Sequence, residues 1–279
     1  MAKAKSDPST EVAEQTSSTA LTTGALDFAA DAGAGMEGAD ADSFAIPFLS
    51  VLQKGSPTVD ESLPTAVEGH RAGMLYDNVS GTVYDGKAGI LIVPCAFRRV
   101  FIRWGPRDMG GGFKGEFLPE EVAAMRASGK IADVDGALLA PLEDGTLNPK
   151  RCDRFSDNRN HYVLVIDPKT GAWREALLSL TSTQIKKSKA LMTGLASVKV
   201  NGPSGLYTPP SFANLVRITT LGESNDKGSW MGVKMVVEGQ VKDGAVYAAA
   251  KAFYASVKSG RVETRYEENS DAAAPASGF

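Results

Sequence analysis

Aromatic rings and guanidinium groups alternate along the stretch FRRVFIR, which spans residues 97–103. In an extended strand successive side chains point to opposite faces, so every second residue lies on the same face. One face would then carry Phe97, Arg99, Phe101 and Arg103. Bases of single-stranded nucleic acid stack on aromatic rings, at about 1–3 kcal/mol per base, while guanidinium groups bind phosphates. The spacing therefore predicts a surface that binds single-stranded nucleic acid.

The same stretch also has a purely structural interpretation. Its other face consists of Val100, Ile102 and Trp104, led by Arg98, and it suits a hydrophobic core. The rings of the first face would in that case lie beneath a second layer of the protein, and the arginines would pair with carboxylates. The sequence leaves both interpretations open.

Other cationic segments extend the predicted surface. Residues 150–161, KRCDRFSDNRNH, interleave basic residues with an aromatic ring, and the glycine run at 110–112 is bracketed by basic residues. The helix predicted near residues 181–195 has lysines on its outer arc and contains no acid to pair with them. Solvated charges and a plain turn are the alternative explanations. The additional candidate residues for nucleic-acid binding are Arg107, Lys114, Arg151, Arg154, Phe155, Lys186, Lys187 and Lys189.

The net charge of −3 is unevenly distributed along the chain. Residues 1–43 carry two lysines and eight acids, and residues 263–279 carry one arginine and four acids. The body between them, residues 44–262, therefore has a net charge of +6. A basic body between acidic tails suits a protein that binds a polyanion, although acidic tails also simply aid solubility.

Composition and cysteine count narrow the class of protein. A hydrophobic content of 43% and a charged content of 23% are ordinary for soluble globular proteins. No apolar run approaches the roughly 20 residues that span a bilayer, and the first residues lack the apolar core of a signal peptide. Cys95 and Cys152 form neither a disulfide framework nor a closely spaced metal pair. We therefore expect an intracellular protein without membrane contacts.

The residue types needed for catalysis do not gather anywhere in the sequence. His70 and His161 are the only histidines, and neither lies beside a nucleophile or at a metal-ligand spacing. The glycine run lacks the Lys-Ser/Thr ending of a nucleotide-binding P-loop. We predict no enzymatic activity, no metal and no cofactor. A carboxylate-dependent nuclease stays open, because paired acids need not be adjacent in sequence.

The chain divides into three regions. Residues 1–43 are rich in small and acidic residues and are predicted to be disordered, as is the acidic tail at 263–279. The body at 44–262 is predicted to form one nucleic-acid-binding domain, within which residues 106–160 are a candidate insertion, with weak periodicity at 130–160.

The expected elements of the body are short strands with a few helices, so the predicted fold class is mainly β (α+β). Helix signals are proline and acids at the start or an amphipathic pattern. The predicted helices lie at 119–128, 181–195 and 245–258. The predicted strands lie near 75–84, at 90–104, in a hairpin at 161–180 and in a hairpin at 212–241.

The last residue, Phe279, stands alone, because no other large apolar residue follows Tyr266. A disordered acidic segment that ends in an aromatic ring and a free carboxylate is typical of a short docking motif, in which the ring fills a pocket on a partner. The candidate partner-binding residues of this tail are Glu267, Glu268, Asp271 and Phe279.

This tail resembles those of phage and bacterial single-stranded DNA-binding proteins, which end in phenylalanine and recruit replication enzymes. The body is similar to the OB-fold core of T7-type phage single-stranded DNA-binding proteins, and IPFLSVLQKGSP and RWGPRDMGGGF resemble tailed-phage proteins encoded among replication genes. The tail is less densely acidic than in that family and contains alanines and a proline. The resemblance implies an OB-like β-barrel core with inserted loops and helices, single-stranded DNA as ligand, and phage or host replication proteins as partners in the host cytoplasm.

Two functions follow from the sequence. The first is a non-catalytic protein that coats single-stranded DNA during phage replication or recombination. The alternative is a structural phage protein, virion-associated or scaffold-like, since a mostly β body with a long disordered N-terminus suits that role as well. The sequence leaves open whether the protein forms homo-oligomers.

Overall fold

The computed structural model describes residues 34–39, 43–106, 109–226, 228–262, 264 and 266. All helices and strands discussed below lie within one compact unit, Asp40–Phe279. This described part contains thirteen strands and three α-helices, so it is mainly β, as predicted. No helix in it is long and apolar enough to span a bilayer.

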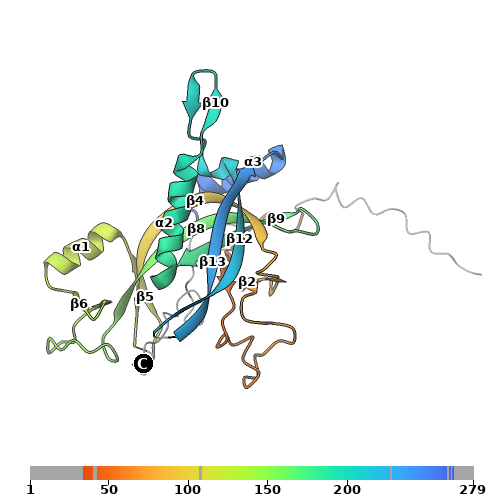
Figure 1. The fold of residues 1–279 in the computed structure, drawn as a ribbon. Helices are drawn as coiled ribbons and strands as arrows, with labels where there is room; N and C mark the ends of the chain where they lie inside the picture. Colours follow the sequence, from red (N-terminus) through yellow and green to blue (C-terminus); the bar gives the residue numbers. More distant parts are fainter. Residues whose placement is uncertain are drawn as a thin grey trace, which may run out of the picture. The chain divides into compact units, whose positions relative to one another are not determined.

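A long antiparallel ribbon of two strands, β4 (Ile90–Trp104) and β8 (Arg154–Ile166), forms the centre of the fold (Figure 1). We call the end of the ribbon that contains Ile90 of β4 and Ile166 of β8 its first end. There the hairpin of β12 (Asn214–Asn225) and β13 (Gly228–Gln240) pairs with β4. On the other side of that end, β9 (Trp173–Leu180) adds to β8. The ribbon is thus flanked by further strands on both sides at this end.

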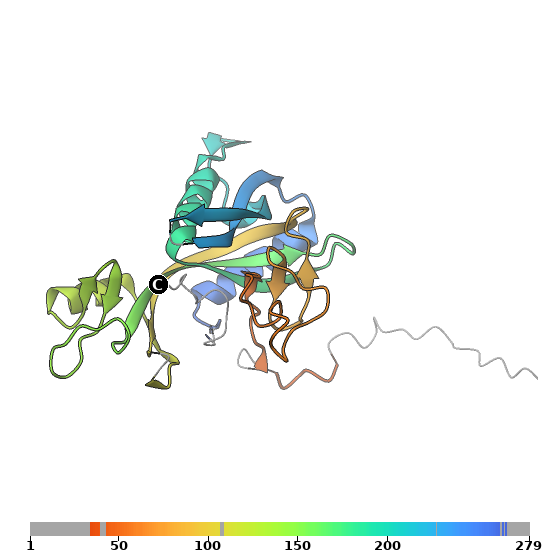
Figure 2. The same ribbon diagram turned by 60° about the horizontal axis from the view of Figure 1, so that its bottom comes forward.

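Different strands flank the second end of the ribbon. There β5 (Phe113–Phe117) pairs with β4, while β7 (Ala137–Leu139) pairs with β8 and with β6 (Ala132–Val134). Helix α1 (Pro119–Ala127) connects β5 to β6. We call β5, α1, β6 and β7 the distal lobe, which lies away from the other helices in both views (Figures 1 and 2).

The distal lobe has its own small hydrophobic cluster. Val122 of α1, Ile131, Leu138 of β7 and Phe155 of β8 are buried together, and Phe101 of β4 packs against them. This cluster is separate from the two larger clusters of the sheet. The ribbon therefore ends in a second, smaller centre of packing.

A helix packs on each face of the main sheet. Leu191 and Leu195 of α2 (Ile185–Ser197) are buried in the cluster on the first face. Phe253 and Val257 of α3 (Gly244–Lys258) are buried in the cluster on the second face. Because apolar residues of the sheet point to both faces, both faces are covered, which is the packing that a two-sided apolar sheet requires.

A smaller sheet, made of β1 (Leu49–Val51), β2 (Leu75–Asp77) and β3 (Val83–Tyr84), packs against the first face. The hairpin of β2 and β3 lies where the sequence LYDNVSGTVY predicted two short strands. Arg174 of β9 forms an ion pair with Asp77 of β2, at 3.5 Å, and so links the two sheets.

Two glutamine side chains occupy part of the outer edge of β13. The Gln53 amide donates to the Met231 carbonyl at 2.9 Å, and its oxygen accepts the Met231 N–H at 2.8 Å. The oxygen of Gln184 accepts the Val233 N–H at 3.1 Å. Among the described strands, only β12 pairs with β13.

The sheets of the described chain do not close into a barrel, so the predicted OB-like barrel is not confirmed. Closure would require the outer strands β13 and β9 to pair. Helix α2 instead packs against both of these strands and fills the first face between them (Figure 1).

The helix predictions at 119–128 and 245–258 are confirmed by α1 and α3, and Asp243 caps α3 by accepting the N–H groups of Ala245 and Val246. The prediction that α2 begins at residue 181 is corrected, because a 3-10 turn, Ser182–Gln184, precedes it. The hairpin at 161–180 is confirmed, but its first strand already begins at Arg154.

A further small hairpin, β10 (Val200–Gly202) and β11 (Gly205–Tyr207), lies between the predicted helix at 181–195 and the predicted hairpin at 212–241, where no element was predicted. It projects beyond α2 in Figure 1.

Candidate nucleic-acid interface

The alternation predicted for residues 97–103 is present in the structure. Across the ribbon, Phe97 pairs with His161, Arg99 with Arg159, Phe101 with Asp157 and Arg103 with Phe155. A bulge at Cys95 shifts the register between Pro94 and Ala96. Because of this extra residue, the side chains of Phe97, Arg99, Phe101 and Arg103 lie on the first face, which is also the face that α2 covers.

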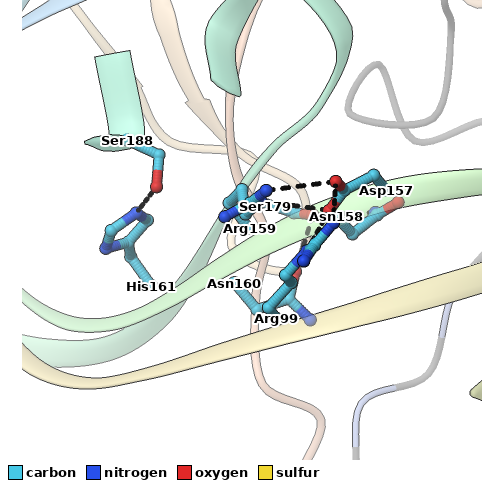
Figure 3. Close-up of polar contacts among 8 residues, drawn as sticks. All are labelled: Arg99, Asp157, Asn158, Arg159, Asn160, His161, Ser179 and Ser188. Atoms are coloured by element: carbon cyan, nitrogen blue, oxygen red, sulfur yellow. Dashed lines mark hydrogen bonds and ion pairs between the residues drawn. The ribbon is translucent and has the colours of Figure 1, made fainter. Parts of the chain in front are cut away.

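Asp157 holds two arginines at the centre of this face (Figure 3). Its oxygens accept hydrogen bonds from Arg99, at 3.1 and 2.8 Å, and from Arg159, at 3.0 and 3.1 Å. Burial opposes ionisation of this carboxyl, but the two guanidinium groups outweigh it and hold the pKa of Asp157 below its usual range. The side chain of Arg99 is 39% exposed, whereas that of Arg159 is 14% exposed.

Asp153 holds a second pair of cations. It accepts hydrogen bonds from Nε of Arg103 at 2.7 Å and from Nζ of Lys114 at 2.8 Å. Burial again raises the pKa of the Asp153 carboxyl, while Lys114 and Arg103 lower it more strongly. The Asp153 side chain is 9% exposed, so both cations cover it.

Each of these carboxylates is shared by two cations, so each group retains a net positive charge. We call the combined set the cation ladder: Arg99, Arg103, Lys114 and Arg159 with Asp153 and Asp157. Four positive charges face two negative ones in it. The structural interpretation, in which carboxylates pair with the arginines, is therefore realised, but without neutralising the surface.

The aromatic rings of this face are less available than the sequence pattern suggested. Phe155 is only 4% exposed and belongs to the distal-lobe cluster, so it cannot stack on a base as predicted. Phe101 packs against the same cluster, with the guanidinium of Arg99 over its ring at 5.1 Å. Phe97 is half-buried and its ring centroid lies 5.0 Å from that of His161.

The remaining candidate cations divide into paired and unpaired groups. Lys187 is half-buried and bonded to Glu223 of β12 at 2.6 Å, which corrects the prediction of three unpaired lysines on α2. Lys186 and Lys189 are exposed. Near the distal lobe, Arg151 and Arg154 are exposed too. None of these four exposed cations forms an ion pair with a residue that the structure describes.

Arg154 does not lie on the face of the ladder. It pairs across the ribbon with Trp104, whose side chain belongs to the second face. Arg107 and the tail residues Glu267, Glu268, Asp271 and Phe279 lie outside the described residues.

The structure brings together a histidine and a serine that are not adjacent in sequence. Nε2 of His161 lies 2.8 Å from Oγ of Ser188 on α2 (Figure 3). Both residues are 1% exposed, and burial together with the charge of Arg159 lowers the pKa of His161 to about 4. The pair thus joins α2 to β8. Sequence reasoning missed it because 27 residues separate the two groups.

A polar chain on the second face was also missed. Asn158 donates to Ser179, which donates to Asn160, and Asn160 donates to the hydroxyl of Tyr266 at 2.6 Å (Figure 3 shows the first three). Tyr266 in turn donates to Glu116 of β5 at 2.9 Å. The chain ties Tyr266 to both the main sheet and the distal lobe. The alternation of two asparagines on β8 was its only sequence signal.

No metal centre is evident in the described part of the chain, where no three His, Cys, Asp or Glu side chains gather closely enough to hold an ion. The fold and the site thus define a mainly antiparallel β protein whose central ribbon carries more cations than acids.

The chain belongs to the Pam3 phage gp34-like protein family, because the model of that family matches residues 15–263. It is therefore a phage protein. Comparison with curated proteins and with solved structures gives no match.

Proposed function

We propose that this phage protein binds single-stranded DNA without catalysing a reaction, in the replication or recombination of phage DNA. The observation that carries the proposal is the shared pairing in the cation ladder. Asp153 and Asp157 position four cations but neutralise only half of their charge. A surface with fixed cations and a net positive charge suits a phosphate backbone.

The ion pairs leave hydrogen-bond donors available. A guanidinium group has five N–H donors, and Arg99 uses two of them on Asp157. The side chains of Arg99, Arg103 and Lys114 are 39%, 37% and 45% exposed. Their orientation is fixed before a ligand arrives, so less side-chain entropy is lost when phosphates bind.

Phosphate contacts are expected to contribute more than base stacking on this face, since Phe155 is buried and Phe97 and Phe101 are half-buried. Binding should therefore show little sequence preference and weaken steeply as salt increases. The proposal further assigns partner recruitment to the acidic tail that ends at Phe279, on the strength of its sequence alone.

Fluorescence anisotropy with a labelled oligo-dT tests the proposal. The full chain should bind at low salt, with a logarithmic affinity that falls linearly with the logarithm of salt concentration. Labelled duplex DNA of the same length, as a comparison, should bind more weakly. Absence of binding to oligo-dT at low salt would overturn the proposal.

A further inference from the structure

Helix α3 presents a second row of aromatic and cationic residues, on the other face of the sheet. Tyr247, Lys251, Tyr254 and Lys258 are spaced by four, three and four residues, which places them along one stripe of the helix. The neighbouring stripe, about 100° around the helix, is buried in the sheet cluster and contains Val246, Ala250, Phe253 and Val257. The row thus borders the buried stripe: Tyr254 packs against the cluster, while Tyr247, Lys251 and Lys258 are exposed.

The rings of this row are held firmly. Phe212 packs beneath both tyrosines, with ring centroids 5.5 Å from Tyr247 and 5.4 Å from Tyr254. Tyr247 is 37% exposed, while Tyr254 is half-buried and carries the ammonium group of Lys258 over its ring at 5.9 Å. One ring is therefore open to a stacking ligand, and the other positions a cation.

The charged side chains of α3 are all cationic. The helix itself contains no acid, and Asp243, the residue directly before it, is engaged as the N-cap. Within the described chain, neither Lys251 nor Lys258 forms an ion pair. Lys258 lies in the last turn, where a cation also complements the helix dipole, but Lys251 lies mid-helix, where the dipole gives no such reason.

Arg98 connects this row to the cation ladder. Its guanidinium donates to the Val257 carbonyl at the end of α3, whereas its neighbour Arg99 points to the opposite face and belongs to the ladder. The outer edge of β4 pairs with β12 as far as Ile92 and with β5 from Phe101. Between these points no described strand pairs with that edge, but the 3-10 turn Ser211–Ala213 lies against it, and the Ser211 hydroxyl donates to the Cys95 carbonyl at 3.3 Å. The part of the edge over which a chain of phosphates can pass is therefore the stretch beyond this turn, residues 97–100.

We infer that single-stranded DNA bound at the cation ladder continues over this edge of β4 onto α3, where Tyr247 stacks on a base and Lys251 and Lys258 bind phosphates. The inference rests on the proposed function and extends it to a second contact surface. Charge complementarity and the continuity through Arg98 single out a polyanion that can bend sharply, which single-stranded DNA does more readily than a duplex.

Replacing the two lysines of this row with alanine in the full chain tests the phosphate contacts. In the double variant Lys251→Ala/Lys258→Ala, the slope of logarithmic affinity against logarithmic salt should be shallower by about 1.4, because each lost contact removes about 0.7 for a single strand. The number of nucleotides bound per protein at saturation should fall as well. The matched control is Lys87→Ala/Lys169→Ala, which removes the same charge from two exposed loop lysines.

Substitution of the exposed ring tests stacking. Tyr247→Leu keeps an apolar contact for Phe212 but removes the aromatic face, so affinity for oligo-dT should fall about fivefold or more. Tyr247→Phe retains the ring and should bind like the wild type. Circular dichroism of each variant shows whether its fold is intact.

The outcomes separate the two proposals. If the wild type does not bind oligo-dT, the proposed function fails. If the wild type binds but the α3 variants keep its affinity, salt slope and site size, only the α3 surface is excluded. Equal losses in the α3 variants and in the Lys87/Lys169 control would also exclude it, because they would reflect net charge alone.

Discussion

Asp153 and Asp157 each accept hydrogen bonds from two cationic side chains, which fixes long side chains that otherwise sample many rotamers. The consequence for mutagenesis is useful. Removing Arg99 leaves the half-buried carboxylate of Asp157 with Arg159, and removing Arg103 leaves the buried carboxylate of Asp153 with Lys114. Variants that test DNA binding at this site therefore do not leave a carboxylate without a cationic partner.

The double variant Arg99→Ala/Arg103→Ala is expected to bind oligo-dT more weakly, with a salt slope shallower by about 1.4, because two phosphate contacts are lost. Anisotropy titrations over a range of salt concentrations measure this slope. The matched control is Arg126→Ala/Arg217→Ala, which breaks two exposed ion pairs outside the ladder and should retain the wild-type slope. Identical slopes in the two variants would contradict the assignment of DNA binding to the ladder.

Buried His161 predicts a pH dependence of stability. Its pKa is about 4 in the folded protein and about 6.5 in an unfolded chain, so between these values only the unfolded state gains the proton. The free energy of unfolding should therefore fall by about 3 kcal/mol as pH decreases from 6.5 to 4. Urea denaturation at several pH values measures it. In His161→Gln this component is absent, so a constant difference between wild type and variant across that range would refute the prediction.

At the scale of the elements, the hydroxyl of Tyr266 links β8 to β5 through Asn160 and Glu116. In Tyr266→Phe the fully buried Asn160 loses its acceptor, so the free energy of unfolding should decrease by about 1–3 kcal/mol. Chemical denaturation measures the change. Tyr207→Phe on the projecting hairpin, where the ring is 51% exposed, serves as control and should change stability by less than about 0.5 kcal/mol.

Elements with one clear periodicity were predictable from sequence. Helix α3 was predicted because its apolar residues, of which Val246, Ala250, Phe253 and Val257 are buried, recur with the period of a helix. The first half of β8, residues 154–160, was assigned to the candidate insertion and not to a strand. It is polar on both faces, since one face carries the ion pairs of Asp157 and the other the asparagine chain, and such a strand lacks the alternation that identifies strands.

The residues that make up the site could be predicted from the sequence, but most of their interaction partners could not. The shared face of residues 97–103 followed from the period of a strand alone. Its partners did not, because the carboxylate bound to Arg99 lies 58 residues away and the acid bound to Lys187 lies on β12. The burial of Phe155 depends on the distal lobe, which the weak periodicity of residues 130–160 did not reveal. Long-range pairing thus decides which predicted residues stay accessible.

At the scale of the whole molecule, a body of net charge +6 lies between two acidic segments in sequence, and the chain belongs to a phage family. A replication protein acts in the infected cell, whereas a structural protein is packaged. Mass spectrometry of purified phage particles should therefore lack this protein, while infected-cell lysates contain it. Stoichiometric recovery from particles would favour the virion-associated alternative.

The two glutamines along the edge of β13 affect whether the sheets of neighbouring copies of this protein pair with one another. A protein that coats a DNA strand brings neighbouring molecules into lasting contact, and an unprotected outer strand would then invite sheets to fuse between them. The side-chain amides of Gln53 and Gln184 already satisfy the backbone of Met231 and Val233. Under the proposed function, we expect neighbouring copies on one DNA strand to lie side by side at this edge without their sheets fusing, and to separate when the DNA is released.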